Sequence, residues 1–519
     1  MKIGLFFGAG AEICYGLPSG GKFAIDLFRQ DPSTYKTRLR TSLQTIDPRS
    51  TYATSWLPTD YQHKRIHAFG KNEFTSLIES SIEYRRSEII RRLNQFDVEC
   101  ENAMTQLGID NMILRARFQE TLGQGFGEML YTHTIRLNSL IANNVLLFSS
   151  EFYSAMLDIV RNGDQVDDLK RYASSFLQLL VGAHGQDLVQ KLNQELFETA
   201  PDDIPIFDDI SGMFRLEFSR AGSMALELLL EEQRSFQMGE NAPISHLLCA
   251  IAQKALENIF TTVLDYQALI DSHFRYLYSP CTEWAKFTRM AIFLKIARDY
   301  IEDQAPNVSE LHVNGYYHDL THAAGLQIEL TAIGTANYNS ILEEVANNIG
   351  VTLPNVLHLN GSIKDYYNPY KNSVITCHSP EDCPTDQILI PFILTQSGLK
   401  PLTSVAMSRR YVDLFDSFQH SDAIVVIGFG FNADDSHING LFRDLIENQD
   451  KRLFWVSRLA DGTAEEQKRN LIKRLRVDPS KRNLITVIPV DTDSREIDGQ
   501  LWLNYVAHGL TSDTSANQR

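Results

Sequence analysis

The chain has 519 residues, 43% of them apolar, and a formal net charge of -17. This length allows roughly two to four domains of ordinary size, and the apolar fraction is sufficient for several buried cores. Because a surface with this excess of negative charge repels phosphate backbones, the composition disfavours direct binding to nucleic acid.

The six cysteines are scattered, without the spacing of a disulfide framework or a Cys-x-x-Cys motif. This usage is typical of a cytoplasmic protein in a reducing compartment. Cys377 and Cys383 are close in sequence, but one pair cannot provide the four ligands of a structural zinc site, so we expect no metal. No apolar run approaches the ~20 residues of a membrane span, and no cleavage site follows the first apolar run. We therefore expect neither a membrane segment nor a signal peptide.

The first strand is predicted at Ile3–Phe7, an uninterrupted apolar run. Such a run is typical of a strand buried on both faces of a parallel sheet. Gly8 and Gly10 follow at once, and glycines at the carboxyl end of a strand allow backbone N–H groups to approach a phosphate. The segment 16–23 matches a P-loop except that Phe23 replaces the Ser or Thr that would hold magnesium, so we favour the first loop as the nucleotide site.

The middle of the chain, 31–324, is predicted to be a mainly helical insertion. The stretch from about 30 to 70 contains three prolines and looks like a loop-rich connection. From about 72 to 304 the apolar periodicity is helical, and an acidic, proline-containing segment at 201–209 is expected to form a loop that divides the block. The periodicity gives two stripes that we interpret as helix-bundle core: Leu247, Leu248, Ile251, Ala255, Ile259 and Val263, and Trp284, Phe287, Ala291, Leu294 and Ile301.

Two histidines near the end of this block, His318 and His322, have the spacing of a metal-binding pair on a helix. Gly315 and Gly325 leave little room for that helix, and no further ligands are evident nearby. We therefore interpret both as hydrogen-bonded polar side chains.

After residue 325 strands and helices alternate. This alternation predicts a doubly wound parallel sheet, an α/β fold of Rossmann type that is interrupted by the helical insertion. The expected domains are therefore 1–30 plus 325–519 for the sheet and 31–324 for the insertion. The expected strands are 328–333, 356–359, 422–428, 453–456 and 484–488, and the expected helices are 341–348, 405–418, 438–447 and 465–475.

Small or polar residues follow four of the predicted strands. Because the carboxyl ends of parallel strands meet at one edge of a sheet, we expect these segments to converge on one crevice. The convergence requires the first strand to lie beside strands near the other end of the chain. The segments are Gly8–Gly10, Thr335–Asn339, His358–Ser362 and Gly428–Asn432.

The residues of these segments resemble those of the sirtuin family. The run from Gly8 to Ala11 with Pro18 is similar to the opening NAD-binding loop, and Thr335-Ala-Asn337-Tyr-Asn339 is similar to the Thr-x-Asn-(Ile/Tyr)-Asp segment. His358-Leu-Asn360-Gly361-Ser362 is similar to the segment with the catalytic histidine, and 427–439 to the late nucleotide loop of bacterial sirtuin-like proteins. The resemblance covers residues 1 to about 24 and 326 to about 490.

The resemblance implies NAD+ as the substrate and Asn337 as a catalytic residue, with His358 or Asn360 in the place of the catalytic histidine. Asp434, Asp435 and His437 either contact the adenosine ribose or cap the following helix. The implied NAD+-binding residues are Gly8, Ala9, Gly10, Ala11, Glu12, Pro18, Thr335, Asn339, Gly361, Ser362, Gly428, Gly430, Asn432, Asp434 and His437.

Three positions depart from the family pattern. Glu12 stands where the family usually has Ser, Asn339 where it usually has Asp, and Asn360 at the place of the catalytic His. An amide has no proton equilibrium near neutral pH, so Asn360 cannot act as a base. Side chains at i and i+2 of a strand share a face, which makes His358 the candidate base.

The expected activity is hydrolysis of NAD+ to ADP-ribose and nicotinamide, as in relatives that deplete NAD during bacterial antiphage defence, by a protein held inactive until triggered. The paired-cysteine zinc module of the deacylases is missing, which favours hydrolysis over protein deacylation. The alternative is a sensor or scaffold subunit that binds NAD+ or ADP-ribose in a defence complex. In either case we expect the insertion to serve regulation or oligomerisation, with a second copy or a partner protein.

Overall fold

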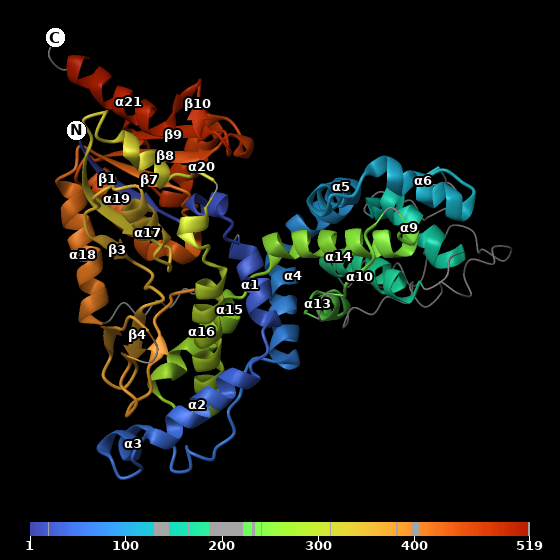
Figure 1. Ribbon diagram of the computed structural model, residues 1–519, viewed down its shortest axis with the longest axis horizontal. Helices are drawn as coiled ribbons and strands as arrows, with labels where there is room; N and C mark the ends of the chain where they lie inside the picture. The colour runs from blue at the N-terminus through green and yellow to red at the C-terminus, as the bar shows by residue number, and fades with distance from the viewer. Residues whose placement is uncertain are drawn as a thin grey trace. The chain divides into compact units, whose positions relative to one another are not determined.

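The computed structural model describes residues 1–18, 20–128, 145–162, 166–185, 222–230, 234–239, 241–311, 313–379, 382–395 and 404–516 (Figure 1). The acidic segment 201–209 lies outside these residues. Within the described ranges, no helix combines the length and apolar character that a membrane crossing requires.

A six-stranded sheet has the order β3-β2-β1-β7-β8-β9, and every neighbouring pair is parallel. The predicted α/β fold with a parallel sheet is therefore confirmed. The strand order is that of a Rossmann-type sheet, and its direction of growth reverses between β1 and β7, where such sheets bind ligands. The strands are β1 (Lys2–Phe7), β2 (Glu329–Thr335), β3 (Val356–His358), β7 (Ala423–Ile427), β8 (Arg452–Arg458) and β9 (Ile485–Val490).

Strand β1 is buried on both faces, which explains its uninterrupted apolar sequence. Ile3, Leu5 and Phe7 contribute to the core on one face, and Phe6 contributes to the core on the other. Helices contribute to both cores, so the sheet is doubly wound. The first core includes residues of α17 (Ile341–Asn348) and α21 (Trp502–Ala516), and the second includes residues of α18 (Val405–Gln419), α19 (Ser436–Glu447) and α20 (Ala464–Leu475).

The chain divides into two compact units. The first unit, 1–19, 31–68 and 270–519, contains the parallel sheet, and the second, 20–30 and 69–269, is helical. The first unit also holds α2 (Ser33–Thr45), α3 (Thr51–Trp56), α16 (Trp284–Gln304), an antiparallel sheet of β4 (Asp365–Asn368), β5 (Ser373–Thr376) and β6 (Ile390–Pro391), and the pair β10 (Glu496–Ile497) and β11 (Gln500–Leu501). The second holds α1 (Gly20–Arg29), α4 (Lys71–Asn94), α5 (Phe96–Leu107), α6 (Asn111–Leu122), α9 (Glu151–Asn162), α10 (Asp167–His184), α13 (Ser223–Leu230) and α14 (Ile244–Val263), and α15 (Gln267–Phe274) continues from it into the first unit.

The units divide the chain at other residues than those expected from the sequence. Residues 31–68 and 270–324, expected in the insertion, belong to the unit of the sheet. Helix α1, expected with the sheet, belongs to the helical unit, because it buries an apolar face and its Arg29 forms an ion pair of 3.3 Å with Glu257 of α14.

The stretch from about 30 to 70 is only partly the loop-rich connection that its prolines suggested, because two helices interrupt its turns and loops. It forms α2 and α3, and the prolines lie at or beyond the helix ends, where they are tolerated. Pro32 is the N-cap residue of α2, and Ser50 caps α3 by accepting a hydrogen bond from the Ala53 N–H group. Both predicted apolar stripes are buried as expected, one in α14 and the other in α16.

The strand register brings the four segments after β1, β2, β3 and β7 to the same edge of the sheet. Phe7 pairs with both Thr335 and Ile427, and Thr335 pairs with His358. The four strands therefore end at the same level, as the parallel arrangement requires.

The loops after β1 and β7 are packed directly against each other. The Gly10 N–H group donates a hydrogen bond of 2.8 Å to the Gly428 carbonyl oxygen, and a Cβ atom on Gly428 would lie 2.1 Å from the Ala11 nitrogen. The N–H groups of Gly8, Gly10, Ala11 and Glu12 all donate to backbone carbonyls. The glycines therefore serve the contact between the loops, and these N–H groups do not form the phosphate cradle expected from the sequence.

We expect Gly428→Ala to lower the free energy of unfolding by about 2–4 kcal/mol, because Gly428 has a φ of +67° and no space for a Cβ atom. Gly430→Ala is the matched control in the same loop, since its Cβ would meet only the Asn432 side chain at 3.5 Å. Urea denaturation measures both. Equal stability of the two variants would contradict the close packing of the loops.

Candidate functional site

A buried carboxyl group, that of Glu12, lies at the centre of the edge where the strands end. Glu12 is only 4% exposed, and both of its oxygens accept hydrogen bonds. The Tyr317 hydroxyl donates to Oε1 at 2.8 Å, and the Asn339 amide Nδ2 donates to Oε2 at 2.7 Å. Two of the three departures from the sirtuin pattern, Glu12 and Asn339, are thus direct partners.

Asn337 belongs to the same cluster. Its amide Nδ2 lies 3.2 Å from the Gly8 carbonyl oxygen and 3.3 Å from the Tyr317 hydroxyl. Its own N–H group donates to the Thr335 hydroxyl, which in turn donates to the Phe7 carbonyl. The end of β2 is therefore fixed to the end of β1, and the Asn337 side chain has one defined direction. We call Glu12, Tyr317, Asn337 and Asn339 the carboxyl cluster.

The carboxyl cluster holds its acid near the midpoint of ionisation. Burial raises the pKa of Glu12 to about 7, against the lowering effect of the hydrogen bonds from Asn339, Tyr317 and Asn337. A carboxyl group with this pKa is able to exchange a proton or carry a charge at neutral pH. Groups with shifted pKa values are concentrated at functional sites, which marks the cluster as the candidate site.

His358 is held between two hydrogen-bond acceptors. Its Nδ1 lies 2.8 Å from the Asn337 carbonyl oxygen and its Nε2 lies 3.0 Å from Oε1 of Glu343. Burial acts to lower the pKa of His358, but Glu343 and the Asn337 carbonyl outweigh it and the pKa is raised. Both ring nitrogens are thus directed at these two oxygens, so neither is left to accept a proton from another group. In this arrangement His358 therefore positions the Asn337 backbone and does not have the geometry of a base.

Asn360, the third departure from the family pattern, has a histidine as its partner. Its Oδ1 lies 3.2 Å from Nε2 of His437, which comes from the first turn of α19. The His437 ring centroid lies 5.6 Å from that of Tyr411. His358 and Asn360, expected to share one face, thus have different neighbours, because β3 ends at His358 and the chain turns at Leu359 and Asn360.

The other predicted site residues fall into two groups. Some have structural contacts: Ser362 donates to Asp365, the partner of Arg410 in an ion pair of 2.7 Å, and the Asn432 carbonyl accepts from Asn439. The rest lie in the loops at the carboxyl edge: Ala9 is exposed, and Gly10, Pro18, Gly430 and Asp434 are partly buried.

Sequence analysis missed Tyr15, Tyr317 and Glu343. Tyr317 reaches Glu12 from outside every motif, and its ring stacks on Tyr15 with centroids 5.2 Å apart. His318, the first member of the apparent metal pair, contacts the Tyr15 hydroxyl through Nδ1 at 3.1 Å. Among the residues that the structure describes, no group of three or more His, Cys, Asp and Glu side chains has the geometry to hold a metal ion.

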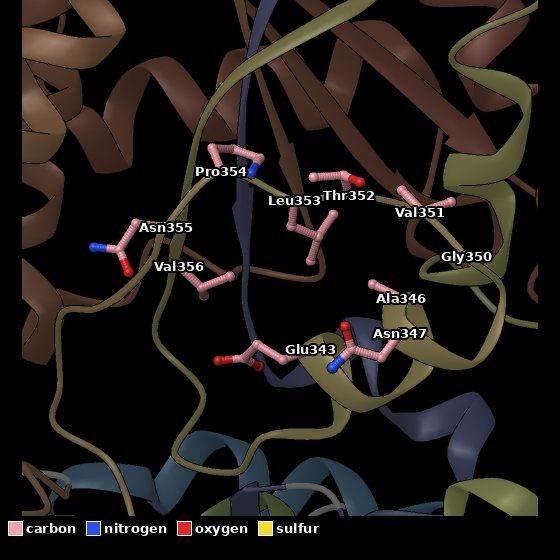
Figure 2. A pocket seen from close by; sticks show the side chains of 10 residues that line it. All are labelled: Glu343, Ala346, Asn347, Gly350, Val351, Thr352, Leu353, Pro354, Asn355 and Val356. Atoms are coloured by element: carbon pink, nitrogen blue, oxygen red, sulfur yellow. The ribbon is translucent and has the colours of Figure 1, made fainter.

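An open pocket of about 500 Å³ lies apart from the carboxyl cluster, between α17 and the segment that leads into β3 (Figure 2). None of the predicted site residues lines it, and its link to the cluster is Glu343, the partner of His358. It is lined by Glu343, Ala346, Asn347, Gly350, Val351, Thr352, Leu353, Pro354, Asn355 and Val356.

Comparison with known proteins finds no protein-family model that matches the chain and no curated protein with a similar sequence.

Glu12→Gln is expected to remove a pH dependence of stability. The pKa of Glu12 is about 7 in the fold and near 4.5 in the unfolded chain, so its contribution is present at low pH and is lost as the pH rises through 7. Between about pH 5 and pH 8 the wild type should lose about 2–3 kcal/mol relative to Glu12→Gln. Urea unfolding at both pH values measures the difference, and a constant difference would show that Glu12 titrates normally.

Glu343→Gln is expected to lower the pKa of His358 from above its ordinary value to below it. The carboxylate that raises the pKa is removed, whereas the burial that lowers it remains. NMR titration of the histidine ring nitrogens reports the change. Glu344→Gln, which removes an exposed charge from the neighbouring position of α17, is the control and should leave His358 unchanged.

Proposed function

We propose that this chain is a sirtuin-like NAD+ hydrolase that cleaves NAD+ to nicotinamide and ADP-ribose. The observation that supports it best is the carboxyl cluster: Asn337, the residue that the resemblance marks as catalytic, is hydrogen-bonded to the loop after β1 at the reversal point of the sheet. Ligands of Rossmann-type sheets bind at this point.

Hydrolysis of the bond between nicotinamide and ribose needs little acid–base catalysis from the protein. Water attacks C1′ of the ribose, the bond to nicotinamide breaks with its electron pair, and nicotinamide leaves as a neutral molecule that needs no proton. The water gives up one proton to solvent. As in glycoside cleavage, the transition state resembles an oxocarbenium ion, so position and charge dominate catalysis. In this proposal Asn337 orients the ribose and the water, and His358 holds the Asn337 backbone through its hydrogen bond to the carbonyl oxygen.

The biological role that accompanies this proposal is depletion of NAD in bacterial antiphage defence. A constitutive hydrolase would kill its own cell, so the activity is held back until it is triggered. The helical unit, 20–30 and 69–269, is the part to which we assign regulation, through a second copy or a partner protein.

A second candidate function is that of a sensor which binds NAD+ or ADP-ribose without cleaving it. Two observations favour it. An amide, that of Asn360, stands at the place of the catalytic histidine, and both ring nitrogens of His358 are already hydrogen-bonded within the protein. Such a protein would pass the signal to an effector in the same complex.

Asn337→Ala is expected to lower NAD+ turnover about a hundredfold or more, because it removes the positioning amide. Turnover is measured by chromatography of nicotinamide and ADP-ribose with purified protein, and by the NAD content of cells that express the chain with its neighbouring genes during phage challenge. The matched control is Asn348→Ala, an exposed amide at the end of α17. Constant NAD content with retained binding of ADP-ribose would establish the sensor instead, and equal turnover by both variants would refute the assignment of Asn337.

A further inference from the structure

The Glu12 carboxyl group is bonded only to neutral donors within the carboxyl cluster. Tyr317 and Asn339 each occupy one of its oxygens, and Asn337 contacts the same Tyr317 hydroxyl. When it is ionised, Glu12 therefore has its hydrogen bonds satisfied, and none of these three partners forms an ion pair with it. The His358 ring acts on Glu12 only through space and lowers its pKa. A charge in a buried site acts on its surroundings far more strongly than one in water.

The nicotinamide ring of NAD+ is a group that such a charge recognises. Its ring nitrogen is quaternary and positively charged, and it carries no hydrogen to donate. It therefore needs a nearby negative charge but no free hydrogen-bond acceptor. Ionised Glu12 offers such a charge, while both of its oxygens already accept hydrogen bonds. The reduced ring of NADH has nearly the same size but no charge, so a carboxylate discriminates between the two forms by charge alone.

We propose that Glu12 makes this site selective for the oxidised, positively charged form of the dinucleotide. The inference rests on the proposed NAD+ site, but it holds for a hydrolase and for a sensor alike. In a hydrolase the same charge also stabilises the positive charge that develops on the ribose as the bond breaks. Tyr317 and Asn339 act as positioning residues, because they hold both carboxylate oxygens.

The selectivity should depend on pH. Two titratable groups face Glu12, which lies in the loop after β1. They are Tyr317 from the segment before β2 and His358 from β3. Burial raises the pKa of Tyr317 well above its ordinary value, so Tyr317 stays neutral, and the pKa of His358 is raised by Glu343 and the Asn337 carbonyl. Glu12, with a pKa of about 7, changes charge between about pH 6 and pH 8, and the Glu12→Gln variant separates this change from any change at His358.

The test is isothermal titration calorimetry of the full chain with carba-NAD+ and with its reduced form, a pair in which the carbocyclic ring prevents cleavage. The wild type should bind the oxidised form about tenfold more tightly at about pH 8, and the preference should shrink toward about pH 6. Glu12→Gln should bind both forms with the affinity that the wild type shows for the reduced form. Glu344→Gln, an exposed charge on α17, should behave as the wild type.

Tyr317→Phe gives an independent readout. It removes one hydrogen bond that lowers the pKa of Glu12, so the pH at which the preference appears should move upward while the preference at high pH remains. If the role of Tyr317 were purely structural, the substitution would weaken the binding of both forms equally at every pH.

The outcomes separate the two proposals. Equal binding of both forms by the wild type, or a preserved preference in Glu12→Gln, overturns the role of Glu12 and leaves the NAD+ site standing. Failure of the wild type to bind either form overturns the proposed function, and this inference with it.

Discussion

The pairing of β1 with β2 and β7 is the constraint on which the rest of the first unit depends. A six-residue segment at the start of the chain occupies the middle of the sheet, between strands that begin at residues 329 and 423. The chain therefore leaves the sheet after β1 and returns to it at β2. This long connection contains the entire helical unit. The same pairing aligns the ends of four strands, and so it decides where a site is able to form.

At that edge the loops hold one another in place. The loop after β1 uses its backbone N–H groups for its own turns and for the loop after β7. Its one carboxyl side chain, that of Glu12, is buried and accepts hydrogen bonds from Tyr317 and from Asn339, which follows β2. The result is a cluster in which the positions of Asn337, Asn339 and Tyr317 depend on one buried carboxyl group. Behind the cluster, the ion pair of His358 with Glu343 ties α17 to the strand end.

The sequence predicts the sheet well because period and composition determine it locally. The apolar run Ile3–Phe7 and the glycine-ended strands predict a buried parallel sheet, and the edge at which the loops meet follows from parallel pairing. The domain boundaries are less evident, because the apolar face of α1 fits a sheet or a bundle equally well. The prolines at 32 and 48 suggested a loop, but α2 begins directly after Pro32, and α3 begins at Thr51, shortly after Pro48.

The site is predictable only in part. The motif at Thr335–Asn339 predicts Asn337 as a site residue, and in the structure Asn337 is hydrogen-bonded within the carboxyl cluster. Tyr317 has no motif, since its role arises from a fold contact across 305 residues to Glu12. The direction in which His358 points depends on Glu343, a residue that the sequence shows only as one of two acids in the first turn of α17. Asn360 and His437 are likewise joined by tertiary contact across 77 residues, which spacing along the chain does not reveal.

We propose that one crevice at the carboxyl edge of the sheet receives the dinucleotide. Hydrogen–deuterium exchange of the full chain with and without saturating ADP-ribose tests it most directly. We expect slower exchange in four separate segments, 8–18, 335–340, 358–362 and 428–437, and unchanged exchange in the pocket at 346–356. Slower exchange confined to 346–356, or no change in any of the four segments, would contradict it.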